Sequence, residues 1–172
     1  MSDRIPGVLD HPDAELVFGL IAPLGVDLTG FLSRFEDELR PFGYAAEVIR
    51  LSTLLKRVEP SDGSWSLVEE PEGTRIDTYM TAGDQFRRGT TRNDALALMA
   101  ASDIAGRRAM DEPVAKRTAR ILVSLKHPAE VLSLREIYDL GFFAIGLYTP
   151  ESERLRHLTE FGEFPPPNPV DC

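Results

Sequence analysis

Residues 16–27, which read LVFGLIAPLGVD, decide the fold of this chain. The apolar run at 16–18 predicts a buried strand, and a helical pattern of apolar residues begins at Leu28. Between them we expect a loop that opens at Gly19 and closes at Gly25. Strand, glycine-bounded loop and helix form the local architecture of a phosphate-binding P-loop. The stretch therefore predicts an α/β protein with a nucleotide-type loop.

The chemistry of this loop departs from the P-loop pattern GxxxxGK[ST]. Val26 and Asp27 stand where the lysine and the serine or threonine of the pattern are expected. The lysine contacts the β- and γ-phosphates, and the hydroxyl binds Mg²⁺. A carboxylate at a helix N-terminus also competes with phosphate for the same backbone N–H groups. Because backbone N–H groups alone can hold phosphate, a phosphate site and a purely structural turn both stay open. The candidate nucleotide-binding residues here are Gly19, Ala22, Pro23, Leu24, Gly25, Val26 and Asp27.

The composition narrows the class of protein. A chain of 172 residues predicts one domain, which we place at 15–160 between a flexible leader at 1–14 and a proline-rich tail at 161–172. The formal net charge of −9 argues against broad binding to nucleic acid. Cys172 is the only cysteine, so an internal disulfide or a multi-cysteine zinc site is excluded. The polar N-terminus shows no signal peptide and no apolar run would span a bilayer, so we expect a cytoplasmic protein with no membrane contact.

Apolar runs and helical periodicity alternate along the chain. We expect an exposed excursion at 59–73, which contains Trp65, the only tryptophan. Strands that alternate with helices predict a three-layer architecture, a parallel sheet flanked by helices. The predicted strands lie at 16–22, 44–51, 120–125 and 142–147, and the predicted helices at 28–39, 51–58, 74–88, 94–120 with a break near 111–113, 128–138 and 150–159.

Four basic residues outside the loop are candidate phosphate contacts. Arg87 and Arg88 precede a glycine, and guanidinium groups bind phosphate in a bidentate way. Lys126 follows a predicted strand, where parallel sheets bind ligands, and it could replace the missing loop lysine. Arg154, on the last predicted helix, could approach a triphosphate. For each of them a solvent-exposed surface position remains the alternative.

Three enzyme classes are argued against by the sequence. A zinc nucleobase deaminase needs H-x-E and P-C-x-x-C, and the sequence contains neither. We therefore expect no zinc and no deamination by the zinc mechanism. Cysteine-nucleophile chemistry is disfavoured because Cys172 lies in the predicted tail, and a nucleophile-elbow motif G-x-S-x-G is missing.

Four segments together resemble one protein family. They are ELVFGLIAPLGVDL, FGYAAEVIRLSTLL, YMTAGDQFRRGTTRNDALALMA and ILVSLKHPAEVLSLREIYDLGFFAIGLYTPESERLRHL. In this order they resemble the N-terminal domain of the bacterial anti-phage dCTP/dCMP deaminases over about residues 15–160. The resemblance implies the P-loop fold of deoxynucleoside monophosphate kinases and a regulatory role for this half of those proteins. Family members deplete deoxycytidine nucleotides during phage infection. Their loop carries a small hydroxyl residue where this chain has Val26, and their deaminase half would begin where this chain reads PPPNPVDC.

The sequence thus predicts a nucleotide-binding, regulatory, P-loop kinase-like domain with no deaminase activity of its own. Its expected ligand is a dNTP or NTP, with Mg²⁺ as a possible companion. One alternative is an active deoxynucleoside monophosphate kinase that transfers phosphate from ATP. Another is a non-catalytic docking module for a separately encoded deaminase subunit or a regulatory RNA. We also expect a homo-oligomer.

Overall fold

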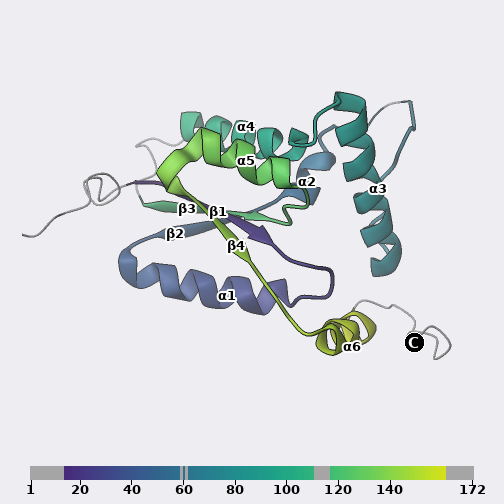
Figure 1. Cartoon of the computed structure of the whole chain (residues 1–172), viewed down its shortest axis with the longest axis horizontal. Coiled ribbons are helices and arrows are strands. Elements are labelled where there is room, and N and C mark those ends of the chain that lie inside the picture. The colour runs from purple at the N-terminus through teal and green to yellow at the C-terminus, as the bar shows by residue number, and fades with distance from the viewer. Residues whose placement is uncertain (1–13, 59, 61, 111–116, 162–172) are drawn as a thin grey trace, which may run out of the picture.

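The computed structural model describes residues 14–58, 60, 62–110 and 117–161. In these ranges four strands form one all-parallel sheet with the order β2-β3-β1-β4 (Figure 1). The predicted α/β class, with a parallel sheet flanked by helices, is confirmed. The strands are β1 (Leu16–Ile21), β2 (Ala45–Arg50), β3 (Thr118–Val123) and β4 (Phe142–Gly146). The third strand begins two residues earlier than the predicted 120–125.

The sheet is covered by helices on both faces, so the core has three layers (Figure 1). Helix α1 (Leu28–Leu39) lies on one face, and α4 (Ala95–Met110) and α5 (Pro128–Tyr138) lie on the other. Successive side chains of a strand point to opposite faces. Accordingly, Ile121 packs in the cluster that contains Leu32 of α1, and Leu122 packs in the cluster that contains Ile104 of α4. Every residue of β3 is buried, which explains why the apolar residues 121–123 follow one another without alternation.

Three further helices and two short 3₁₀ segments complete the described fold. They are α2 (Leu51–Leu55), α3 (Glu72–Thr90), α6 (Glu151–Phe161), η2 (Arg40–Phe42) and η3 (Asp139–Gly141). Helix α4 ends at Met110, and the predicted break near 111–113 lies outside the described residues. Most of the leader at 1–14 and of the tail at 161–172 also lies outside them.

The expectation that the excursion at 59–73 is exposed is wrong for its largest side chains. Trp65 and Leu67 are half-buried and pack against the core cluster on the α4 side of the sheet. Burying an indole removes a large apolar area from water, so this connection folds back onto the core. Its polar residues Asp62, Gly63 and Ser64 are exposed as predicted.

The connections leave the two central strands in opposite directions. From β1 the chain crosses the α1 face to reach β2, and from β3 it crosses the opposite face, through α5, to reach β4. In open parallel sheets, ligands bind in the crevice at the carboxyl ends of strands where the direction reverses. The fold therefore locates a candidate site where residues 22–27 and 124–127 follow β1 and β3.

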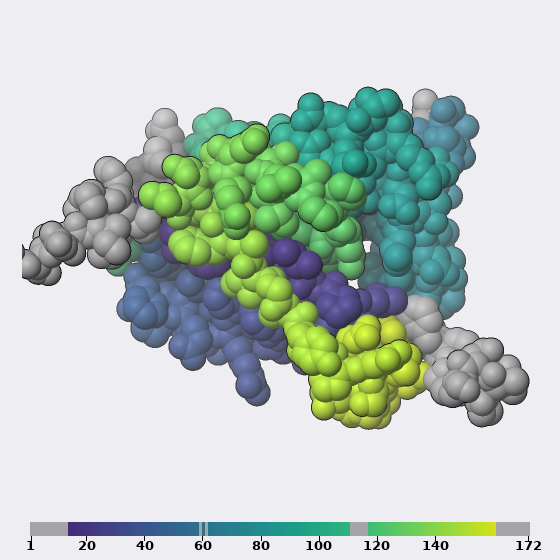
Figure 2. All heavy atoms as spheres, viewed as in Figure 1, coloured from purple at the N-terminus to yellow at the C-terminus, as the bar shows by residue number. Residues whose placement is uncertain are grey.

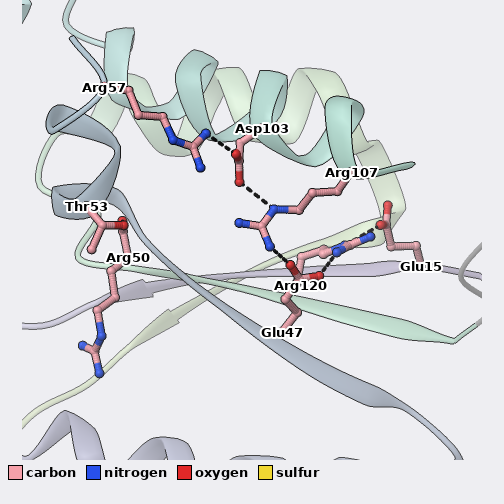
Figure 3. Close-up of polar contacts among 8 residues, drawn as sticks. All are labelled: Glu15, Glu47, Arg50, Thr53, Arg57, Asp103, Arg107 and Arg120. Atoms are coloured by element: carbon pink, nitrogen blue, oxygen red, sulfur yellow. Dashed lines mark hydrogen bonds and ion pairs between the residues drawn. The ribbon is translucent and has the colours of Figure 1, made fainter. Parts of the chain in front are cut away.

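An alternating series of charged residues ties α4 to the sheet (Figure 3). The side chain of Arg120, on β3, is 2% exposed and is held by Glu15 and Glu47. Arg107 of α4 binds the same Glu47 and also binds Asp103, and Arg57 binds Asp103. A buried guanidinium is tolerated when carboxylates pair with it. We call this series, Arg57–Asp103–Arg107–Glu47–Arg120–Glu15, the charge ladder.

Among the described residues, no helix has both the length and the apolar character that crossing a membrane requires.

Candidate functional site

A cavity of about 840 Å³ opens at the carboxyl ends of β1, β2 and β3. Its walls are the loop after β1, the start of α2, one side of α3, the segment after β3 and the last turns of α6. In Figure 2 a small opening is visible between the green atoms of α5 and the teal atoms of α3. The cavity thus lies at the reversal point of the sheet.

Seven of the sequence-predicted site residues line this one cavity. They come from three separate parts of the chain, and their convergence depends on the parallel sheet. The residues are Ala22, Pro23, Leu24, Gly25, Val26, Arg87 and Lys126. The other four, Gly19, Asp27, Arg88 and Arg154, do not line the cavity.

Gly19 belongs to the sheet, so the expectation that the loop opens there is wrong. It lies inside β1 and pairs with Leu122 of β3 and Ala144 of β4. A Cβ atom at this position would lie 2.6 Å from Leu125 Cδ1 and 2.9 Å from the ring of Phe142. Gly19 therefore serves close packing between neighbouring elements. The match to GxxxxGK[ST] is also looser than expected, because five residues, 20–24, separate Gly19 from Gly25.

Asp27 occupies the N-terminus of α1 with its own side chain. Its Oδ1 accepts a hydrogen bond from the backbone N–H of Gly30 at 2.9 Å. A Cβ atom at position 30 would lie 2.3 Å from Asp27 Oδ2, so the carboxylate sits directly against the first turn. In a P-loop the N–H groups of this turn bind phosphate. Here an aspartate cap already satisfies one of them.

Gly25 and Arg154 fix the position of the loop against α6. Gly25 has a φ of +87°, and a Cβ atom there would lie 2.6 Å from the carbonyl oxygen of Arg154. Arg154 Nη1 donates to the carbonyl oxygen of Leu24 at 3.2 Å. Arg154 therefore braces the backbone of the loop, whereas His157, one turn later on α6, lines the cavity.

Glu130 holds the two cationic residues of the cavity wall, Lys126 and Arg87, in place. Its side chain is fully buried and accepts hydrogen bonds from the backbone N–H groups of Lys126 (2.7 Å) and His127 (3.0 Å). It also accepts one from Arg87 Nη2 at 2.8 Å. The Lys126 ammonium donates to the carbonyl oxygen of Ala22 at 3.3 Å. Partial burial lowers the pKa of Lys126, and the nearby charge of Glu130 opposes this effect.

The set of candidate binding residues chosen from the sequence does not include five further polar residues that line the cavity. Arg50 is the last residue of β2 and Ser124 directly follows β3. The rule that ligands bind at strand ends, which selects Lys126, also points to Ser124 and would have found Arg50. Ser124 has a left-handed φ of +74°. Arg75, Tyr79 and His157 lie on α3 and α6, and local sequence patterns do not reveal how these helices pack against the sheet.

The α3 wall combines an aromatic ring with a network of charges. The guanidinium of Arg75 lies 5.7 Å from the centre of the Tyr79 ring, within the range of a cation–π contact. The hydroxyl of Tyr79 donates to Glu69 at 2.7 Å. Burial raises the pKa of Tyr79, and the hydrogen bond to Glu69 adds to the effect. This wall offers an apolar face with polar groups at its rim.

In the part of the chain that the structure describes, no three His, Cys, Asp or Glu side chains gather as a metal site would require. Neither protein-family models nor curated protein sequences give a match to this chain. The geometry of the cavity is therefore the basis of the functional argument.

Proposed function

We propose that this chain is a nucleotide-binding, P-loop kinase-like domain with a regulatory role, related to the anti-phage dCTP/dCMP deaminases and without deaminase activity of its own. One observation carries the proposal. The loop at 22–26, Lys126 and Arg87 line a single cavity at the carboxyl ends of the parallel strands. Ligand sites of α/β proteins lie at this position of the sheet.

The dimensions and lining of the cavity support a nucleotide as the ligand. Its volume of about 840 Å³ falls in the range of small-molecule sites, roughly 300–1,000 Å³. Leu51, Ile76 and Tyr79 provide an apolar and aromatic surface for a base, and Lys126 and Arg87 provide charges for phosphate. A nucleotide combines both kinds of group in one molecule.

The chemistry of the loop favours binding over phosphate transfer. Transfer requires a lysine on the β- and γ-phosphates and a hydroxyl on Mg²⁺, and Val26 and Asp27 supply neither. Asp27 is engaged as the cap of α1. A domain that binds a nucleotide without consuming it is suited to sensing its concentration.

Isothermal titration with dCTP, dTTP, dCMP, ATP and GTP, with and without Mg²⁺, tests the proposal. We expect micromolar binding of at least one of them. Lys126→Gln should weaken that binding by roughly tenfold or more, because a hydrogen bond to a charged group contributes about 1.5–3 kcal/mol. Arg135→Gln is the control, since Arg135 is exposed on α5 and does not line the cavity. If no nucleotide of the panel binds, the proposal fails and a docking module for a deaminase subunit or an RNA takes its place.

An active deoxynucleoside monophosphate kinase is the second candidate, because Arg87 and Lys126 face the same cavity. Arg87 would hold the acceptor and Lys126 the donor phosphates. Steady-state production of ADP from ATP with a panel of deoxynucleoside monophosphates would support this activity. A rate that stays at background at high protein concentration would rule it out.

A further inference from the structure

The carboxylates that line the cavity already have cationic partners. Glu72 binds Arg75, Asp84 binds Arg87 at 3.2 Å, and Glu69 binds Lys56 at 2.8 Å. These contacts also engage the guanidinium groups of Arg75 and Arg87. A ligand with negative charge would therefore interact most strongly with cations of the cavity that no carboxylate contacts.

Arg50 is one such cation. Within the described ranges its guanidinium has no hydrogen bond or ion pair, and its side chain is exposed. Figure 3 shows that it points away from the charge ladder and toward α1. Arg50 lines the main cavity and also a neighbouring cavity of about 440 Å³ between α1 and β2. It thus stands where the two cavities adjoin.

Lys126 is the second cation. Its ammonium group contacts the neutral carbonyl oxygen of Ala22, and the two carboxylate oxygens of Glu130 are taken by Arg87 and by backbone N–H groups. Arg50 is the last residue of β2, and Lys126 follows the neighbouring strand β3. In the β2–β3 register Arg50 pairs with Val123, three residues before Lys126. Both residues therefore reach the same edge of the sheet.

We propose that Arg50 and Lys126 bind the phosphate chain of the nucleotide directly and that this site takes the nucleotide in its metal-free form. The inference rests on the proposed function and specifies the ligand of that same site. Mg²⁺ in proteins is held by carboxylates and hydroxyls together with the phosphates. Asp27 stands at the hydroxyl position of the P-loop pattern, and the carboxylates that line the cavity bind cations of the protein. The side-chain cations Arg50 and Lys126 would neutralise the phosphate charge in place of Mg²⁺.

The proposal predicts an unusual direction for the effect of Mg²⁺. Mg²⁺ on a triphosphate occupies the oxygens that Arg50 and Lys126 would contact, and it reduces the negative charge that attracts them. Adding Mg²⁺ should therefore weaken the binding of a nucleoside triphosphate. A loop that uses the metal in the usual way would show the opposite.

The experiment is a titration of each bound triphosphate from the panel, and of inorganic tripolyphosphate as a base-free probe, in EDTA and in excess Mg²⁺. We expect tighter binding in EDTA, and Arg50→Gln should weaken it by roughly tenfold. Arg34→Gln on α1, an exposed arginine that lines neither cavity, is the matched control and should bind as the wild type does. Thermal unfolding of both variants verifies that they fold.

The outcomes separate this inference from the proposed function. If a nucleotide binds and Lys126→Gln weakens it, but Arg50→Gln does not, then the cavity is a nucleotide site and the role of Arg50 is refuted. Binding that requires Mg²⁺ refutes the metal-free form. A panel in which no nucleotide binds overturns both.

Discussion

Replacing Gly25 with alanine should destabilise the protein by about 3 kcal/mol. The φ of +87° at this position is left-handed, and an L-residue there costs about 1–2 kcal/mol. The added Cβ atom would also lie 2.6 Å from the carbonyl oxygen and 2.9 Å from the Cβ of Arg154. Crowding of this kind adds about 1–3 kcal/mol. The two costs act together because the clash is with backbone, which cannot rotate away.

Two other glycines separate these costs. Gly63 has a φ of +70° and no atom within 4 Å of an added Cβ, so Gly63→Ala should show the backbone cost alone, about 1 kcal/mol. Gly19 has no left-handed φ, but an added Cβ would meet Leu125 and Phe142, so Gly19→Ala should show crowding alone, about 2 kcal/mol. The three variants form one series in which only Gly25→Ala carries both effects.

Urea unfolding and thermal unfolding, both followed by circular dichroism, measure the stability of the three variants. For a domain of this size, 1 kcal/mol corresponds to about 2–4 °C in Tm, so Gly25→Ala should lower Tm by roughly 6–12 °C. If Gly25→Ala unfolds at the same urea concentration as Gly63→Ala, α6 does not press against the loop and the bracing role of Arg154 is refuted.

Two further predictions concern buried or paired carboxylates. Hydrogen bonds from Arg92 (2.9 and 2.8 Å) and from Ser133 (2.7 Å) hold the pKa of Asp94 far below its ordinary 3.8. The ionised Asp94 therefore stabilises the folded state fully above pH 3.8, and this contribution to the free energy of unfolding is lost as the pH falls below that value. Urea midpoints between pH 5 and pH 2 should therefore fall more steeply for the wild type than for Asp94→Asn, and parallel curves would contradict the assignment. Glu130→Gln should cost about 3 kcal/mol, because it removes the buried carboxylate of the Arg87–Glu130 pair and leaves Arg87 with only the exposed Asp84. The exposed Glu136→Gln on the same helix is the control, and equal midpoints for the two variants would show that Glu130 does not hold the wall of the cavity.

The positions of the strands along the chain could be predicted from apolar runs in the sequence. Residues 121–123 form an apolar run because helices cover both faces of β3. The strand order was not predictable in this way, since it depends on pairings between residues about 100 positions apart, such as Leu16 with Ala119. Patterns within one segment carry no information on which strand lies beside it.

The errors at the site have particular physical causes. Gly19 suggests a loop because glycine is common in turns, yet glycine also permits close packing inside a strand, and the sequence does not distinguish the two. Arg88 and its neighbour Arg87 look alike in sequence, but only Arg87 faces the buried Glu130. The helical phase that separates them is fixed by how α3 packs against α2 and α4.

The charge ladder of Figure 3 also limits how this sequence can evolve. Each carboxylate of its centre serves two arginines, as Glu47 does for Arg107 and Arg120 and as Asp103 does for Arg57 and Arg107. Losing Glu47 leaves the buried Arg120 with Glu15 as its remaining carboxylate in the ladder, and removing one partner of a buried ion pair is strongly destabilising, whereas replacing the members together with apolar residues can be neutral. Relatives of this protein should therefore keep the ladder whole or lose it whole, and its positions should covary as one group.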